Sequence, residues 1–296
     1  MSGMGDKVRT PRKALYAALA LALLGIGIIL GMGSVALWPR IFQSALRWRF
    51  LGGLAPGGFS DGPEKLHRVP EPADLVKLYP DIVVRQWSPK SPSVALTFDD
   101  GPDTEYTPKI LDILRKYNVR ATFFLIGKSA ERHPDIVKRI VVEGHAIGNH
   151  TYHHGNLANM APWQVVMELK RANTALARIT NEWPLAVRPP YGALDPLAVE
   201  AIGREGYRVV LWTIDSLDWH GLSAEKVLAN VMPVLKSGVI VLHHSAGGPQ
   251  EDLGGMLDAL PTIIETLQQQ GYLFVTIPEV LEQHDAARKA MTRERP

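Results

Sequence analysis

The sequence predicts an α/β fold, specifically a small or distorted (β/α) barrel of about seven strands preceded by one transmembrane helix. From Ser93 onward, short apolar runs rich in β-formers alternate with amphipathic stretches, a pattern typical of parallel α/β structure. About seven such units fit into roughly 190 residues, and no Gly-rich nucleotide loop follows the first strand. These observations favour a barrel over a doubly wound sheet.

The first element in the chain is an apolar segment at residues 14–38, which contains no charged side chain. As a helix it would extend about 37 Å, enough to span a bilayer. Residues 1–13 carry four basic side chains against one acidic one, so we expect this end in the cytoplasm and the remaining chain outside, as a single-pass membrane protein. A cleaved signal peptide is the main alternative, for which Ser34 and Ala36 give a weak cleavage signal.

The Gly- and Pro-rich residues 39–89 are expected to form a stalk that holds a domain away from the membrane. Within them, residues 75–87 are apolar enough to add a short element to that domain. Residues 90–283 are expected to form the main folded domain, and the charged residues 284–296 a frayed tail.

The strands of the domain are predicted from apolar runs. They are expected at 94–98, 121–126, 146–148, 185–187, 209–214, 239–242 and 273–277. Apolar residues at i, i+3, i+4 and i+7, for example at 110–117 and 136–141, predict helices between them.

Composition limits the chemistry that is available. The chain has no Cys, which excludes disulfides, thiolate zinc sites, iron–sulfur clusters and a cysteine nucleophile, so a metal must be held by His and carboxylate. The formal net charge of +2 is too small to indicate a nucleic-acid partner.

Unusual polar residues follow the predicted strands directly. These groups are 99–102, 150–154, 188–192, 215–219 and 243–244. In a barrel they meet on the rim formed by the carboxyl ends of the strands, where barrel enzymes keep their active sites.

Two of these groups offer metal ligands. His150 and His154 are four residues apart and could project to one side of a helical turn, although His153, His145 or a plain surface pair are alternatives. Two His and one carboxylate form a hydrolytic metal site that needs no sulfur. Asp99 and Asp100 could simply cap a turn. Alternatively, a metal cation could keep both carboxylates ionised, so that one binds the metal and the other accepts a proton.

Five ordered motifs resemble the polysaccharide deacetylases, also called the NodB homology domain or carbohydrate esterase family 4. They are Thr97-Phe98-Asp99-Asp100-Gly101-Pro102, His150-Thr151-x-x-His154, Arg188-x-Pro190-Tyr191, Asp215-x-x-Asp218-Trp219 and Leu242-x-His244. The resemblance covers about residues 90 to 282 and implies a NodB-like barrel. It selects His154 over His153 and His244 over His243. Strand alternation also turns the side chain of His243 away from the face that carries His244. Ser245 departs from the Asp often seen after the last histidine.

The resemblance also implies roles for individual residues. Asp100, His150 and His154 would hold one divalent metal, with zinc expected and cobalt, manganese or nickel as alternatives. Asp99 would be the general base, kept ionised by Arg188, and His244 the general acid, held by Asp218. The backbone N–H of Tyr191 would stabilise the oxyanion, and Tyr191, Trp219 and Leu242 would contact substrate.

The expected function is hydrolysis of the acetamide of N-acetylated sugars in cell-wall polysaccharide, with peptidoglycan expected from the predicted location outside the membrane. The products would be acetate and a free amino sugar. A deacetylase of chitin-like oligosaccharide or exopolysaccharide is the alternative within the enzyme class. A catalytically silent wall-binding protein is the alternative from another class.

Overall fold

A computed structural model of the chain describes residues 72–248 and 251–293. Its helices are α3 (Pro72–Leu78), α4 (Tyr106–Lys116), α5 (Gly127–Arg132), α6 (Pro134–Val142), α7 (Pro162–Thr180), α8 (Pro196–Arg204), α9 (Ala224–Val231), α10 (Gly254–Gln269) and α11 (Ile277–Arg293). Its strands are β1 (Val83–Val84), β2 (Ser93–Asp99), β3 (Thr122–Leu125), β4 (Ala146–Asn149), β5 (Ala186–Val187), β6 (Arg208–Val210), β7 (Ile214–Asp215), β8 (Val239–His244) and β9 (Leu273–Phe274). Short 3₁₀ turns are η2 (Leu157–Asn159), η3 (Pro190–Gly192), η4 (Asp218–His220) and η5 (Met232–Val234).

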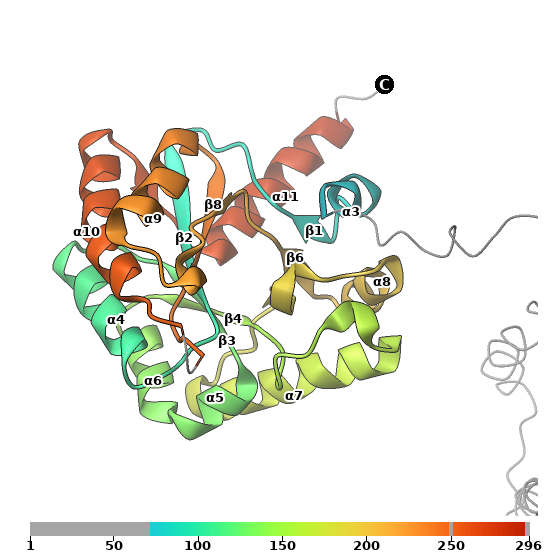
Figure 1. Cartoon of the computed structure of the whole chain (residues 1–296). Coiled ribbons are helices and arrows are strands. Elements are labelled where there is room, and N and C mark those ends of the chain that lie inside the picture. Colours follow the sequence, from blue (N-terminus) through green and yellow to red (C-terminus); the bar gives the residue numbers. More distant parts are fainter. Residues whose placement is uncertain (1–71, 249–250, 294–296) are drawn as a thin grey trace, which may run out of the picture. The chain divides into compact units, whose positions relative to one another are not determined.

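The strands form one curved sheet, in the order β1-β6-β5-β4-β3-β2-β8-β7, with β9 beside β2. Every ladder between named strands is parallel. Figure 1 shows α4, α6, α7, α9 and α10 around the outside of this sheet. The predicted parallel α/β architecture, a distorted barrel, is therefore confirmed in the described residues.

Two strand predictions differ from the structure. Residues 273–277 were expected to form one strand, but β9 ends at Phe274 and α11 begins at Ile277. Residues 209–214 were expected to form a single strand, but they divide between β6 and β7, which lie near opposite ends of the sheet. The N–H of Leu211 donates to the carbonyl of Val84, whereas the N–H of Thr213 donates to the carbonyl of Ile240. The hydrogen-bonding partner thus changes from β1 to β8 within three residues, which a continuous apolar run does not reveal.

Alternation along β2 and β8 sorts their side chains into two layers. In β2, Phe98 belongs to the core between the sheet and the outer helices, and Ala95 to a separate cluster with residues of β8 and α11. Because successive strand residues point to opposite faces, Asp99 shares the face of Ala95. The same alternation in β8 separates His244 from His243, as the sequence analysis predicted.

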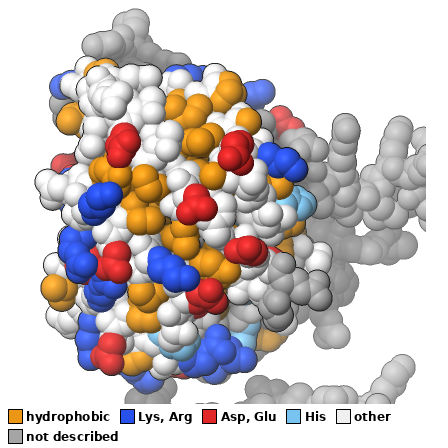
Figure 2. Space-filling model, turned by 60° about the vertical axis from the view of Figure 1, so that its left-hand side comes forward, with side chains coloured by type: hydrophobic (Ala, Val, Ile, Leu, Met, Phe, Trp, Pro, Cys, Tyr) orange, Lys and Arg blue, Asp and Glu red, His pale blue; other side chains and the backbone are white. Residues whose placement is uncertain are grey.

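The outer core forms where amphipathic helices cover the sheet. Of the apolar residues predicted in and directly after α4, Ile110 and Leu114 are fully buried, and Ile113 and Tyr117 pack partly buried against the same core. They join residues of β2, β3, α9 and α10 in one apolar cluster. On the face seen in Figure 2, acidic and basic side chains are intermingled, and ion pairs such as Arg139 with Asp112 join α6 to α4.

Both ends of the described chain contact the sheet. Strand β1, within the stretch expected to be a stalk, pairs with β6, so the apolar residues 75–87 do add a short element to the domain. Helix α11 continues to Arg293 through residues expected to fray, and Asp285 accepts from Arg208 at 2.7 Å.

The predicted membrane span, residues 14–38, lies outside the described residues, as does most of the predicted stalk. None of the helices in residues 72–248 and 251–293 combines the length and apolarity needed to cross a bilayer.

Candidate active site

A cleft of about 780 Å³ opens where the carboxyl ends of the strands meet. Eight of the ten predicted site residues line it: Asp99, Asp100, His150, His154, Tyr191, Trp219, Leu242 and His244. The other two, Arg188 and Asp218, are buried and bonded to Asp99 and His244. Five segments that are far apart in the sequence therefore supply one site.

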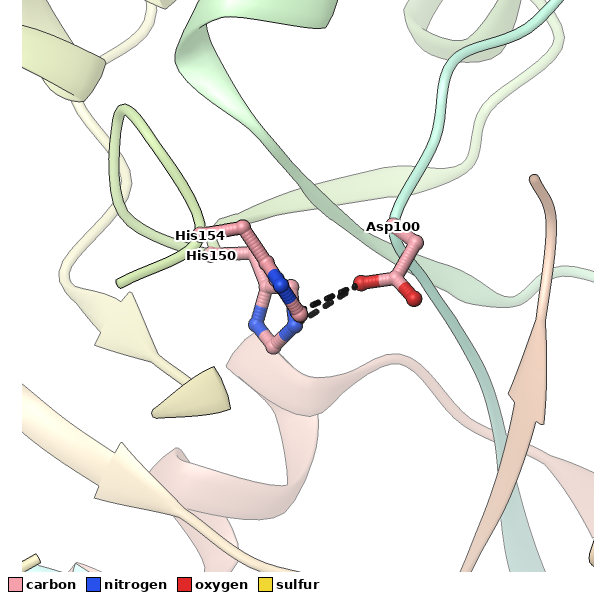
Figure 3. A group of neighbouring side chains, drawn as sticks. All are labelled: Asp100, His150 and His154. Atoms are coloured by element: carbon pink, nitrogen blue, oxygen red, sulfur yellow. Dashed lines mark ion pairs between the residues drawn. The ribbon is translucent and has the colours of Figure 1, made fainter. Parts of the chain in front are cut away.

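Asp100, His150 and His154 converge at one point of this cleft (Figure 3). Asp100 Oδ1 lies 3.1 Å from Nε2 of His150 and 3.0 Å from Nε2 of His154. This carboxylate oxygen is buried and has no hydrogen-bond partner of acceptable geometry. Two imidazole nitrogens and a carboxylate oxygen that meet in this way fit a divalent cation.

The environment of His150 and Asp100 suits metal ligation. Nδ1 of His150 lies 2.7 Å from the carbonyl oxygen of Arg188, so this nitrogen carries the proton and leaves Nε2 free to ligate. Burial alone would raise the pKa of Asp100, but the imidazoles of His150 and His154 lower it well below its usual range. The carboxylate therefore stays ionised.

The loops that carry these residues adopt strained backbone conformations. Five non-glycine residues of the site loops have a positive φ: Asp100 (71°), Thr151 (65°), His154 (59°), Tyr191 (60°) and Leu217 (55°). Such conformations are uncommon for these residue types and cluster at functional sites. At Asp100 the turn directs a side chain adjacent to Asp99 into the same cleft.

Asp99 is held by a buried arginine. Its Oδ1 accepts from Nη1 of Arg188 at 2.8 Å, and Asp99 Oδ2 lies 3.9 Å from Nε2 of His150. Arg188 also donates to Oγ1 of Thr97 at 2.7 Å and to the carbonyl of Val210. Burial lowers the pKa of Arg188 and Asp99 opposes the shift, so the guanidinium remains charged.

Partly buried His244 and buried Asp218 form a second pair. Nδ1 of His244 lies 2.7 Å from Asp218 Oδ1, and the backbone N–H of His244 donates to Oδ2 at 2.8 Å. Burial opposes protonation of His244, but Asp218 outweighs it and the net effect raises the pKa of His244 to about 9. The imidazole is therefore protonated at neutral pH, with Nε2 as its remaining donor.

The three predicted substrate-contacting residues lie on the walls of the cleft. Tyr191 is 71% exposed, and its ring packs edge-on against His154. Trp219 is 40% exposed and stacks on His220, whereas Leu242 is almost fully buried. Two of the three thus present an accessible aromatic surface to a ligand.

The alternative histidines lie elsewhere. His153 is bonded to Glu168 on α7. His243 is fully buried on the other face of β8, stacked on Phe98, and His145 is buried against Phe123. None of the three belongs to the Asp100 group.

Sequence reasoning missed several residues that support the site. Asn149 is fully buried, donates to Asn173 and accepts from the N–H of Thr151, which orders the loop between His150 and His154. Trp212 packs near the guanidinium of Arg188 and lines the cleft. For Asn149 the available signal was a polar residue directly after the predicted strand 146–148. For Trp212 the continuous apolar run 209–214 concealed the break between two strands.

Comparisons with known proteins point to one family. The family model described as polysaccharide deacetylase matches residues 87–210. A peptidoglycan-N-acetylglucosamine deacetylase of Bacillus cereus is 44% identical over 189 residues, covering 64% of this chain and 68% of the relative. A chitooligosaccharide deacetylase of Azorhizobium caulinodans is 33% identical, covering 63% of this chain and 93% of the relative.

Two solved structures give the same result. A peptidoglycan N-acetylglucosamine deacetylase superimposes with a TM-score of 0.66 and 40% identity, over 70% of this chain and 95% of that one. A pseudoenzyme of carbohydrate esterase family 4 from Bacillus anthracis gives 0.62 and 30% identity, over 68% and 69% of the two chains. This chain belongs to the polysaccharide deacetylase family and is a hydrolase of carbon–nitrogen bonds other than peptide bonds.

Proposed function

We propose that the chain is a metal-dependent deacetylase that removes acetyl groups from N-acetylated sugars of peptidoglycan and releases acetate. The observation that carries this proposal is the convergence of the Asp100, His150 and His154 group with the Asp99–Arg188 and His244–Asp218 pairs in one cleft. The name of the relative from Bacillus cereus supports peptidoglycan as the substrate.

The residues that would hold the metal are Asp100, His150 and His154. Two imidazoles and one carboxylate suit zinc, and cobalt, manganese and nickel are the alternatives to test. A divalent cation held there supplies the positive charge that polarises the acetyl carbonyl and activates water.

Asp99 is proposed to take the proton of the attacking water. Its Oδ1 is occupied by Arg188, which leaves Oδ2 on the His150 side to act as general base. The guanidinium fixes the orientation of this buried carboxylate. The backbone N–H of Tyr191 is proposed to donate to the developing oxyanion.

His244 is proposed to protonate the leaving amine. Asp218 accepts from Nδ1, so the proton on Nε2 is the one available to the substrate. Asp218 also stabilises the imidazolium form, so the acid is charged before reaction. Trp219 and Leu242 are proposed to contact the sugar and its acetyl group on the walls of the cleft.

Acetate release by the full chain tests this function. Peptidoglycan and N-acetylglucosamine oligomers are compared before chelation, after thorough chelation and after zinc is restored. We expect activity that disappears with the chelator and returns with zinc. Activity that survives chelation would contradict the metal mechanism, and preference for the oligomers would favour the chitin-like alternative, which the Azorhizobium relative's name supports.

A silent wall-binding protein is the outcome if no substrate is deacetylated. The similar pseudoenzyme from Bacillus anthracis indicates that related proteins can lack activity. In this chain the proposed metal ligands, base and acid are all present, which favours catalysis.

We also propose that residues 14–38 anchor the protein in the cell membrane with the catalytic domain outside, where peptidoglycan lies. The uncharged length of this segment and the basic residues before it support the proposal. External protease on intact cells is expected to remove the domain and leave residues 1–13 protected. A mature protein beginning after Ala36 would instead identify a cleaved signal.

A further inference from the structure

Helix α5 is tied to both loops that carry the proposed metal ligands. The N–H of Ile126 donates to the carbonyl of Gly101 at 3.0 Å, and the N–H of Gly127 donates to the carbonyl of Thr151 at 2.9 Å. Gly127 also packs directly on α7, since a Cβ there would lie 2.8 Å from the Cα of Ala172. The position of α5 relative to the Asp100, His150 and His154 group is therefore fixed by backbone contacts.

Arg132, the last residue of α5, presents a cation to the same cleft. It lies five residues beyond Gly127, about 7 Å further along the helix. Its Nη2 donates to Oγ of Ser129 at 3.1 Å, and both residues line the cleft together with His133. Within the described parts of the chain no carboxylate forms an ion pair with Arg132, in contrast to Arg139 on the next helix.

The charges of the cleft make Arg132 distinctive. The acidic residues in the lining are Asp99, Asp100, Asp103, Asp215 and Glu251, whereas Arg132 is the only Lys or Arg among the described lining residues. Besides His244 and the proposed metal, Arg132 is therefore the group of the described lining that carries a full positive charge toward an anionic group on a bound polysaccharide. Ser129 engages one donor of the guanidinium, which leaves other N–H groups able to bind a carboxylate.

We propose that Arg132, oriented by Ser129 and flanked by His133, binds a carboxylate carried by a sugar next to the one being deacetylated. This inference rests on the proposed function and deepens it by naming the substrate class. In peptidoglycan the neighbouring sugar carries a lactyl group and a peptide with free carboxylates, whereas chitin-like oligomers are neutral. Arg132 thereby favours peptide-bearing glycan and sets the register in which it enters the cleft.

The test compares substrates that differ in their carboxylates. The full chain, Arg132→Gln and Lys128→Gln are each assayed for acetate release on peptide-bearing peptidoglycan fragments, on the same glycan after the peptides are removed, and on neutral N-acetylglucosamine oligomers. Lys128 is exposed on α5 and does not line the cleft, so Lys128→Gln is the matched control. Removing the peptides breaks the amide bond to the lactyl group and frees the lactyl carboxylate, so the middle substrate carries this carboxylate in place of those of the peptide.

We expect Arg132→Gln to lower the ratio of kcat/KM on the fragments to kcat/KM on the oligomers about 5-fold, mainly through KM, while Lys128→Gln keeps the ratio of the unaltered protein. Arg132→Lys should restore part of the ratio, and salt should weaken the preference. An unchanged ratio in an active Arg132→Gln enzyme would overturn the subsite alone. Absence of acetate release from every substrate by the unaltered protein would instead overturn the proposed function.

Discussion

The hydroxyl and the backbone N–H of Ser245 both donate to the carbonyl oxygen of Asp99, at 3.0 and 2.8 Å. Ser245 is fully buried at the end of β8. A Cβ on Gly101 would lie 2.5 Å from Oγ of Ser245, so there is little space around this hydroxyl. The family often has Asp after the last histidine. This chain has Ser245 there, a small residue whose two hydrogen bonds hold the peptide carbonyl between Asp99, the proposed base, and Asp100.

Ser245→Ala should therefore reduce both stability and activity modestly. The carbonyl of Asp99 keeps the N–H of residue 245, so only one hydrogen bond is lost, at about 1 kcal/mol of unfolding free energy. We expect kcat to fall about 3- to 10-fold because the Asp99 and Asp100 turn loosens. Urea unfolding and acetate release at saturating zinc measure the two effects.

Ser237→Ala is the matched control. The hydroxyl of Ser237, which precedes β8 at the end opposite Ser245, accepts from the N–H of Ser93. That variant should lose stability without loss of kcat. If Ser245→Ala behaves in the same way, the hydroxyl has no part in positioning Asp99.

Adjacent aspartates should separate metal binding from proton transfer. In Asp99→Asn the amide oxygen can still accept from Arg188 and the three proposed ligands are untouched, so zinc should bind while kcat falls at least about 100-fold. In Asp100→Asn the ligand charge is lost, and zinc affinity should drop about 10-fold or more. Calorimetric zinc titration and acetate release distinguish the two variants. An active Asp99→Asn enzyme would exclude Asp99 as the base.

Removing the carboxylate of Asp218 should move the alkaline limit of activity. A raised pKa keeps His244 protonated up to about pH 9 in the metal-free protein, and the acid is lost as pH rises through that value. Asp218→Asn removes the negative charge, so the pKa should fall toward the ordinary value of about 6.5. NMR titration of the His244 imidazole in the metal-free proteins measures this shift directly.

In the loaded enzyme the cation repels the imidazolium, so the alkaline limb of the kcat/KM profile should lie below pH 9. The Asp218→Asn profile should turn down at a lower pH still. Identical alkaline limbs in the two enzymes would show that another group controls this side of the profile.

How far the sequence predicted the site can be judged from particular residues. Strand alternation correctly separated His244 from His243, because it uses local geometry that a sequence encodes directly. His154 lies beside Asp100 as expected, but spacing left its register open and only the resemblance selected it over His153.

Long-range contacts were beyond such reasoning. The sequence identified Arg188 as a partner of Asp99 only through the resemblance, and nothing predicted its complete burial or its bond to Thr97, which lies 91 residues away. The division of residues 209–214 depends on which strands flank the segment in space. Arg132 can be related to the site only because backbone hydrogen bonds join α5 to two loops that lie far apart in the sequence.

The buried imidazole of His243 should make the fold sensitive to acid. Both ring nitrogens lack a hydrogen-bond partner, and the nearest carboxylate, that of Asp218, is 3.9 Å from Nδ1. Burial lowers the pKa of His243 to about 4. The unfolded chain takes up this proton near pH 6.5 and the folded chain only near pH 4, so protonation favours unfolding between these values. Stability is therefore highest above pH 6.5 and falls by about 3 kcal/mol by pH 4 through this residue.

His243→Leu removes the titrating group and keeps an apolar side chain of similar size against Phe98. Between pH 7 and pH 4.5 the unfolding free energy of the unaltered protein should fall about 2 kcal/mol further than that of His243→Leu. Urea unfolding at the two pH values measures both changes. Part of the decline should remain, because burial also lowers the pKa of His145 to about 4. His220→Leu, at an exposed histidine beside Trp219, should leave the decline unchanged. Equal declines in His243→Leu and in the unaltered protein would mean that the acid sensitivity arises elsewhere in the chain.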